Sequence, residues 1–336
     1  MKHGGNIDTF ARQIGCLPSQ VLDFSANINP EQALDWRQLS VNLSPYADPD
    51  YSTLKQVLKQ RYQLPLTADC EVFNGASAAI FALLAHLKPH DVILYTPIYS
   101  EYERIAQQLG CTLHKINRFS PFTPVNIPEQ STVIFVNPAT PDGTLYDMPA
   151  LLAQWQAAGC TILIDESFLD FCTADSTAKA IPLIKNLYLI KSLSKFYGCA
   201  GVRVGFVSAD AALIADLKRH EPAWKLSSFD MAYIQTALSN RAFIEHTRAQ
   251  TAQLRALLQQ TLQQSGLFET LYPSQANFLL ARLADRDAYV LQQQLAPARI
   301  LLRVCDSFDG LDARYVRFAV KEATAIAQLA HALSHV

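Results

Sequence analysis

The sequence predicts an α/β protein with a mostly parallel sheet and a second, smaller α+β domain. Between residues 71 and 207, short apolar runs of strand length alternate with segments of helical spacing. This alternation is typical of a parallel sheet covered by helices on both faces. After residue 208 the pattern changes to successive helices followed by strands. The 336 residues suffice for one large domain and one smaller domain.

The elements can be predicted in chain order from periodicity and turn residues. The first thirty residues predict an arm with a short helix at 10–17, an extended piece at 21–24 and turn residues at 25–30. Two helical stretches are expected within 31–62, around the breaker-rich loop 44–51. Strands are expected at 71–73, 92–95, 112–116, 132–136, 161–164, 187–190 and 202–207, with helices at 76–87, 99–109 and 148–158. Beyond them we expect helices at 211–219, 229–238, 242–265 and 322–334 and strands at 276–281, 300–304 and 315–319.

Composition and charge argue against several classes of protein. Apolar residues make up 50% of the chain and charged residues 17%, as in globular proteins. The net charge of -2 offers no basic surface for nucleic acid. We therefore expect no nucleic-acid partner. We also expect no membrane partner, since no apolar run has the length of a membrane span. The seven scattered cysteines lack Cys-x-x-Cys spacing, which favours reduced residues in a cytoplasmic protein.

The most informative segment is 190–206, which follows a predicted buried strand. It places Ser192, Ser194 and Lys195 close to Arg203, with small residues between the lysine and the arginine. A lysine amine can form a Schiff base with an aldehyde, while hydroxyls and a guanidinium bind phosphate. Such a set suits pyridoxal phosphate (PLP). Taken alone it also suits a surface loop, because Ser-x-x-Lys arises often by chance.

Three other strand ends supply what a PLP site needs. The run 74–77 opens a helix after a strand, so Ala76 and Ser77 can bind phosphate at a helix N-terminus, or Ser77 can simply cap the helix. Tyr99 follows the strand 92–95 and can stack on a pyridine ring, or lie in the core. Asp165 ends a buried strand and can pair with a protonated ring nitrogen, cap a helix, or form a salt bridge.

Together these segments resemble the fold-type-I PLP enzymes of the aspartate aminotransferase superfamily, within the group of threonine-phosphate decarboxylases and histidinol-phosphate aminotransferases. The matching runs are 3–6 (HGGN), 22–30 (LDFSANINP), 46–51 (YADPDY), 165–171 (DESFLDF), 192–197 (SLSKFY) and 310–321 (GLDARYVRFAVK). The resemblance implies a seven-stranded sheet and a homodimer with shared active sites. It also implies an N-terminal arm (1–30) that packs on the small domain and the active site, a large PLP-binding domain (31–225) and a small domain (226–336).

The resemblance assigns roles to individual residues. Lys195 would be the Schiff-base lysine, and Asp165 would pair with the ring nitrogen. The residues implied in cofactor binding are Tyr46 from the partner subunit, Ala76, Ser77, Tyr99, Thr140, Asp165, Ser192, Ser194, Lys195 and Arg203. The residues implied in substrate binding are His3, Gly4, Asn27, Arg303 and Arg317, the last of them at the substrate carboxylate.

The sequence departs from the aminotransferase pattern at two places around the cofactor's phenolic oxygen. Phe168 stands where aminotransferases of this group usually carry tyrosine, and this favours decarboxylation. Ala139 and Thr140 replace the usual Asn-Asn pair, and Asn137 is out of register for that role. Thr140 could supply a hydroxyl in place of the second asparagine.

The resemblance and the two departures from it leave three candidate functions. The first is decarboxylation of L-threonine O-3-phosphate, a small phosphorylated amino acid, in cobalamin biosynthesis. The second is transamination of histidinol phosphate or a similar amine. The third is a non-catalytic PLP-fold binding protein, which the intact Lys195, Asp165 and Arg203 argue against. No Gly-x-Gly-x-x-Gly, phosphate-loop or His-Glu-x-x-His motif is present, and no metal is expected.

Overall fold

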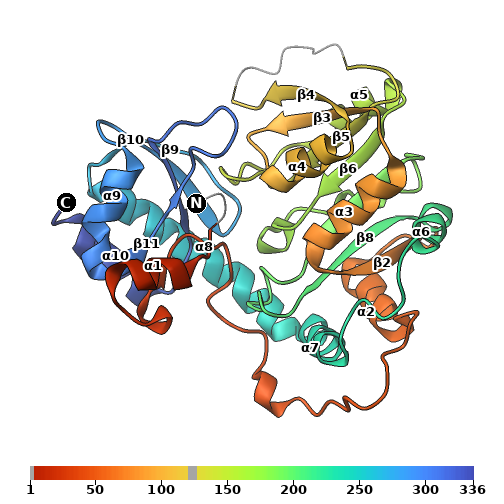
Figure 1. Cartoon of the computed structure of the whole chain (residues 1–336), viewed down its shortest axis with the longest axis horizontal. Coiled ribbons are helices and arrows are strands. Elements are labelled where there is room, and N and C mark those ends of the chain that lie inside the picture. Colours follow the sequence, from red (N-terminus) through yellow and green to blue (C-terminus); the bar gives the residue numbers. More distant parts are fainter. Residues whose placement is uncertain (1–3, 120–126) are drawn as a thin grey trace.

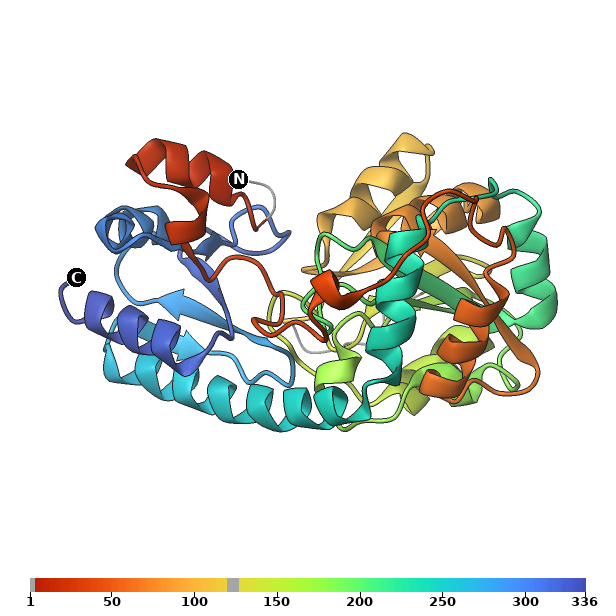
Figure 2. The ribbon, with the colours of Figure 1, turned by 90° about the horizontal axis from the view of Figure 1, so that it is seen from below.

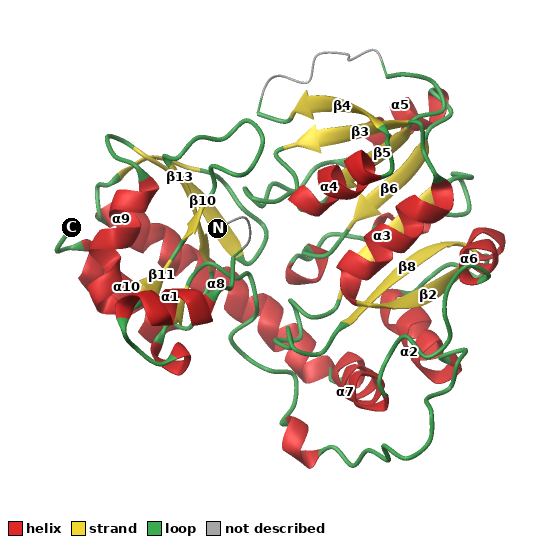
Figure 3. Cartoon of the chain, viewed as in Figure 1, coloured by secondary structure: helices red, strands yellow, loops and turns green. Residues whose placement is uncertain are grey.

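The computed structural model describes residues 4–119 and 127–336, and a seven-stranded sheet forms its larger part (Figures 1 and 3). The strands lie in the order β2, β8, β7, β6, β5, β3, β4. Paired strands are parallel except where β8 runs antiparallel to β2 and β7. The bounds are β2 Ala68–Asn74, β3 Asp91–Thr96, β4 Thr112–Asn117, β5 Thr132–Val136, β6 Thr161–Asp165, β7 Leu187–Ser192 and β8 Val204–Asp210. The expected mostly parallel seven-stranded sheet is confirmed.

Helices cover both faces of this sheet because successive side chains along each strand point to opposite faces. Leu94 and Leu163 pack against one set of helices, α3 (Gly75–Leu87), α4 (Ser100–Gln108) and α6 (Ala211–Lys218). Their neighbours Ile93 and Ile162 pack on the other face with α5 (Met148–Ala157). At the β2–β8 end, that second face is covered by α2 (Ser52–Tyr62) and α7 (Ser228–Ser239).

A smaller antiparallel sheet forms a second α+β part, as expected. Its strands lie in the order β12, β13, β10, β9. Apolar side chains of the sheet, such as Phe318, pack with those of the helices, such as Leu258 and Leu329. The long helix α8 lies along the small part, and one end of it reaches the large part (Figure 2). The bounds are β9 Phe268–Leu271, β10 Phe278–Leu283, β12 Arg303–Val304, β13 Tyr315–Ala319, α8 Arg241–Gln264, α9 Ala288–Leu295 and α10 Ala323–Leu333.

The N-terminal segment joins the small sheet to the large one. After α1 (Ile7–Ile14), the short strand β1 (Leu22–Asp23) pairs in parallel with β11 (Ile300–Leu301). Phe24 is buried in the core of the small part. Further along, the backbone N–H of Asn29 donates to the carbonyl of Lys195 at 2.9 Å. The segment therefore crosses from the small sheet to the lysine loop.

The domain limits at 30/31 and 225/226 stay a prediction. The structure adds one observation that bears on the second limit. Tyr233 and Ile234 of α7 share a core with Leu54 and Leu58 of α2. These contacts tie α7 to the large sheet, although the sequence division places residues from 226 onward in the small domain.

Several predicted elements differ from those observed. The single strand expected at 300–304 is two strands in different sheets, because β11 pairs with the N-terminal segment and β12 with β13. The first helical stretch expected in 31–62 is one 3₁₀ turn, Trp36–Gln38, whose residues bury no apolar face. Strand β9 and helix α9 were not expected, although α9 buries Leu291 and Leu295 at helical spacing.

Within the described ranges, no helix is both long and apolar enough to cross a membrane. No group of three histidine, cysteine or acidic side chains in these ranges could hold a metal ion. All seven cysteines have free thiols, and five of them are buried.

Candidate functional site

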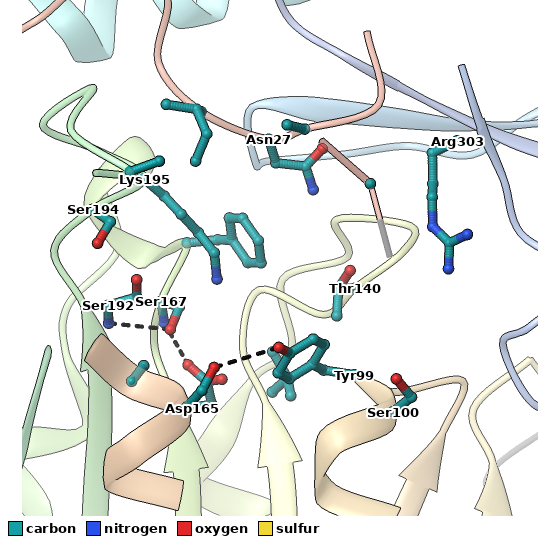
Figure 4. A pocket seen from close by; sticks show the side chains of 18 of the residues that line it. Asn27, Tyr99, Ser100, Thr140, Asp165, Ser167, Ser192, Ser194, Lys195 and Arg303 are labelled. Atoms are coloured by element: carbon teal, nitrogen blue, oxygen red, sulfur yellow. Dashed lines mark hydrogen bonds between the residues drawn. The ribbon is translucent and has the colours of Figure 1, made fainter. Parts of the chain in front are cut away.

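A cavity of about 350 Å³ opens beyond the carboxyl ends of the central strands, where ligands bind in such sheets (Figure 4). Residues of the N-terminal segment, the large sheet and the small sheet all line it. The predicted residues that line it are Gly4, Asn27, Ala76, Ser77, Tyr99, Thr140, Asp165, Ser192, Ser194, Lys195, Arg203, Arg303 and Arg317. Tyr46 does not line the cavity of its own chain, and His3 lies outside the described residues.

Asp165 is held at the tip of β6 by two hydrogen bonds. Its Oδ2 accepts from the hydroxyl of Tyr102 at 2.9 Å, and its Oδ1 accepts from the backbone N–H of Ser167 at 2.8 Å. The side chain is almost fully buried. A buried carboxyl group fixed in this way can pair with a cationic ligand in the cavity.

Lys195 follows β7, and its ammonium group points into the cavity towards Asp165 (Figure 4). Its Nζ lies 4.2 Å from the centroid of the Phe168 ring. Burial lowers the pKa of this amine to about 8, opposed by Asp165 and assisted by the positive charges of Arg317 and Arg203. A larger share of the amine is therefore neutral near pH 8 than in an exposed lysine, as a nucleophile requires.

Groups that can bind an anion gather at the N-terminus of α3, beside Arg203. A Cβ added at Gly75 would lie 2.6 Å from Nη2 of Arg203, and one added at Gly205 would lie 2.5 Å from the backbone nitrogen of Ala76. Only glycines therefore permit the guanidinium and β8 to approach the helix so closely. Arg203 also contacts the hydroxyl of Ser194 at 3.5 Å. Free backbone N–H groups, a guanidinium and serine hydroxyls together suit a phosphate.

Two arginines of the small sheet, Arg317 and Arg303, face the same cavity. Nη1 of Arg317 donates to Oγ1 of Thr140 at 3.2 Å, and its Nη2 donates to the carbonyl of Ser25 at 3.0 Å. Its Nε is buried without a hydrogen-bond partner among the described residues. Burial lowers the pKa of Arg317 to about 10. Arg303 donates to Oγ of Ser307 at 2.6 Å, so each arginine is oriented by a hydroxyl.

Comparisons with known proteins identify the family of the chain. The family model described as "Aminotransferase class I and II" matches residues 20–336. The chain belongs to this family. It is 33% identical to the "Threonine-phosphate decarboxylase" of Salmonella typhimurium, over 99% of this chain and 96% of the relative.

Two solved structures of histidinol-phosphate aminotransferases are also similar to this chain. The enzyme of Clostridium acetobutylicum is 25% identical, with a TM-score of 0.83, over 93% of this chain and 98% of its own. That of Sinorhizobium meliloti, solved in complex with pyridoxal-5'-phosphate, is 18% identical, with a TM-score of 0.85, over 98% of this chain and 94% of its own. The second likeness bears on the fold alone.

The structure places the departures from the aminotransferase pattern in detail. The Asn137 side chain turns away from the cavity and forms hydrogen bonds with the backbone of Tyr146 in both directions. Ala139 is buried and brings no polar group. Thr140 lines the cavity and accepts from Arg317. Thr140 is therefore the residue of this segment whose hydroxyl meets the site.

Tyr46 lies on the exposed loop between β1 and α2, and 82% of its surface is accessible. Its ring centroid lies 4.8 Å from that of Trp224, which is also exposed. Within a single chain, Tyr46 therefore lies away from the cavity that Lys195 lines. The expected contact with the cofactor phosphate would need a second subunit.

Sequence reasoning missed three polar residues that support the site. Tyr102 holds Asp165, Ser167 accepts from the backbone N–H of Ser192 at 3.2 Å, and Ser307 orients Arg303. Tyr102 follows the predicted site residue Tyr99 by one helical turn, and this spacing could have indicated that both face the site. Ser167 and Ser307 carry no comparable signal, because their role depends on which loops meet in the folded chain.

Proposed function

We propose that this chain decarboxylates L-threonine O-3-phosphate to (R)-1-amino-2-propanol O-2-phosphate and CO₂, as a PLP-dependent carboxy-lyase of cobalamin biosynthesis. The observation that carries the proposal is the pair of buried arginines, Arg303 and Arg317, that face the lysine cavity. A substrate with one phosphate and one carboxylate matches such a pair. The Salmonella typhimurium relative, named for this activity and similar over nearly the whole chain, supports the proposal.

The cofactor of this enzyme is PLP, and the cavity residues fit it. We propose that Ala76, Ser77, Ser192, Ser194 and Arg203 bind its phosphate, where glycines leave room beside the helix N-terminus. When bound, PLP supplies a ring that accepts the electrons released as the carboxylate leaves.

The charges of the site suit the ring and the amine. Asp165 would keep the ring nitrogen protonated, since its carboxylate is already fixed by Tyr102 and Ser167. Tyr99 would cover the ring face, and Ser77 lies 3.4 Å from its hydroxyl. Lys195, with its lowered pKa, would provide the attacking amine.

The substrate would be held at both ends. Arg317 would bind the carboxylate, with Thr140 and the carbonyl of Ser25 fixing the guanidinium. Arg303 would bind the phosphate with Gly4 and Asn27 nearby, and the buried Oδ1 of Asn27 has no partner among the described residues. The resemblance assigns His3 to the same phosphate, and this residue lies outside the described ranges. Two fixed ends would set the bond to the carboxylate perpendicular to the ring, which is the geometry that favours its cleavage.

Transamination of histidinol phosphate is the second candidate function. The Clostridium acetobutylicum enzyme is named for it, and the fold is shared. Phe168 favours decarboxylation, because it offers no hydroxyl to the cofactor's phenolic oxygen. A non-catalytic role would not explain why Lys195, Asp165 and Arg203 line the same cavity.

A homodimer with shared sites is part of the proposal. The exposed loop that carries Tyr46, with Leu43 and Trp36 also exposed along it, supports a partner subunit at this face. Tyr46 would then reach the cofactor phosphate of the partner. A cytoplasmic location is proposed as well, and the seven free thiols are compatible with it.

The deciding experiment measures CO₂ release from purified, PLP-loaded protein given L-threonine O-3-phosphate and no 2-oxo acid. We expect steady release that Lys195→Ala abolishes. Absence of release, together with amino transfer from histidinol phosphate to 2-oxoglutarate, would establish the second candidate instead. Activity retained in Lys195→Ala would contradict both.

A further inference from the structure

Arg118 is a buried arginine that none of the roles above uses. It follows the edge strand β4, yet only 6% of its surface is accessible. Its backbone N–H donates to the carbonyl of Thr96 at 2.7 Å, which anchors the residue to β3. The guanidinium lies under the loops that follow β3 and β5. A buried guanidinium must be fully paired, so its partners reveal what it holds.

The donors of Arg118 are divided between these two loops. Nη2 donates to the carbonyl of Pro97 at 2.7 Å and to the carbonyl of Thr140 at 3.1 Å. The charge is balanced by Asp142, whose Oδ1 lies 2.9 Å from Nη2. Nη1 also donates to the hydroxyl of Tyr146 at 3.1 Å. One planar group thus joins the loop of Tyr99 to the loop of Thr140.

Both loops lead directly to the site. Pro97 precedes Tyr99 by two residues, and Tyr99 lines the cavity. Thr140 has its carbonyl on Arg118 and its hydroxyl on Nη1 of Arg317. A short chain of contacts therefore runs from Arg118 through Thr140 to Arg317. Within the described part of the chain, no carboxylate forms an ion pair with Arg317, so its position depends on Thr140 and Ser25.

We propose that Arg118 is a positioning residue for carboxylate recognition: it fixes the backbone of Thr140 so that the Thr140 hydroxyl holds Arg317 in place. This inference rests on the proposed role of Arg317 at the substrate carboxylate. It goes beyond that role, because it assigns a function to a residue that does not line the cavity. Replacing Arg118 should thus weaken the binding of ligands that carry a carboxylate and leave the binding of ligands without one unchanged.

The planar fork of arginine is essential to this role. A lysine at position 118 would keep a positive charge for Asp142, but a single ammonium group cannot donate to Pro97, Thr140 and Asp142 in the same geometry. Arg118→Lys therefore preserves the buried charge balance and removes the link between the two loops.

The test compares two ligands that differ only by the carboxylate, O-phospho-L-serine and O-phosphoethanolamine. Their dissociation constants are measured from the initial absorbance change of PLP-loaded protein, before any turnover. In Arg118→Lys we expect the preference for O-phospho-L-serine to fall about tenfold, while affinity for O-phosphoethanolamine and for PLP changes by less than about twofold. Thr140→Val should cause the same loss, and the double variant should add little to it.

A matched control distinguishes positioning from stability. Lys225 belongs to another buried ion pair of the large sheet, 2.8 Å from Glu71, which keeps Lys55 as a second partner. Lys225→Met should lower the unfolding temperature and leave the ligand preference unchanged. If Arg118→Lys behaves like Lys225→Met, or weakens both ligands equally, the proposal is wrong.

Two further outcomes keep the test decisive. If Arg118→Lys does not fold, Tyr146→Phe removes one contact of the guanidinium, and an unchanged preference in that variant overturns the proposal. If the wild type fails to prefer O-phospho-L-serine, Arg317 is not a carboxylate site and the inference fails. If it prefers that ligand but releases no CO₂ from L-threonine O-3-phosphate, the proposed function fails and the inference on Arg118 stands.

Discussion

The ammonium nitrogen of Lys195 lies 4.2 Å from the centroid of the Phe168 ring. Phe168 meets Phe278 edge-to-face at 4.9 Å, and the guanidinium carbon of Arg317 lies 5.3 Å from the Phe278 centroid. Contacts through two phenyl rings thus connect the lysine that follows β7 to an arginine of the small sheet. Both cations lie beside apolar rings, and burial lowers both pKa values.

The first prediction concerns the hydroxyl that Phe168 lacks. In Phe168→Tyr we expect CO₂ release from L-threonine O-3-phosphate to fall about tenfold, because the new phenol can donate to the cofactor's phenolic oxygen and alter the ring's electronics. Transfer of the amino group to 2-oxoglutarate should become measurable. Phe168→Leu, which removes the ring without adding a hydroxyl, is the control and should gain no amino transfer. Equal gain in both variants would contradict the role given to the hydroxyl.

The second prediction follows from the pKa of Lys195. Covalent capture of PLP requires the neutral amine, and burial places the pKa of Lys195 at about 8. The capture rate of cofactor-free protein should therefore rise with pH and level off above a midpoint near 8, since the amine is protonated below it and neutral above it. Stopped-flow absorbance measures this rate. A midpoint near that of an ordinary lysine, about 10.4, would show that burial does not tune the amine.

The third prediction concerns Tyr102, which holds Asp165 through its hydroxyl at 2.9 Å. Tyr102→Phe should cost about 1 kcal/mol of unfolding free energy and lower the rate of CO₂ release about threefold to tenfold, because the carboxylate loses a fixed donor. The matched control is Tyr188→Phe, which alters another tyrosine of the same hydrophobic core. That control can change stability but should leave the rate unaffected. If both variants change the rate alike, the contact with Asp165 is not what matters.

The sequence was sufficient to predict residues whose position follows from local rules. Asp165 is the last residue of the apolar strand β6 and Lys195 follows soon after β7, and the ends of parallel strands gather at one edge of the sheet. Ala76 and Ser77 open a helix, which determines the direction of their backbone N–H groups. These positions need only the ends of the strands and the start of the helix, and periodicity together with turn residues predicts both.

Contacts between distant segments could not be predicted in this way. Leu302 separates the short strands β11 and β12, because β11 pairs with β1 of the N-terminal segment and β12 pairs with β13. The pairing of β1 with β11 joins residues from nearly opposite ends of the chain. Arg118 follows the predicted strand 112–116 and carries no signal of its own in the sequence, yet the loops after β3 and β5 contact its guanidinium. Tertiary packing decides such cases, because short segments carry too little local preference to specify them.

The last prediction tests whether two chains share each site. Tyr46 is exposed in its own chain, and the proposal places it at the cofactor phosphate of a partner. Tyr46→Ala and Lys195→Ala should each be nearly inactive, because each removes one part of every site. Mixing them, with reversible denaturation to exchange subunits, should restore about a quarter of wild-type activity, since half of the dimers then hold one intact site.

The controls for this mixing experiment separate shared sites from simple refolding. Each variant refolded alone should stay inactive, and Lys195→Ala mixed with Asp165→Ala should regain nothing, because both changes fall in the same half of the site. Sedimentation should give a mass of two chains for every sample. If Tyr46→Ala keeps full activity, or if mixing restores none, Tyr46 does not serve the partner's site, and the exposed loop has another role.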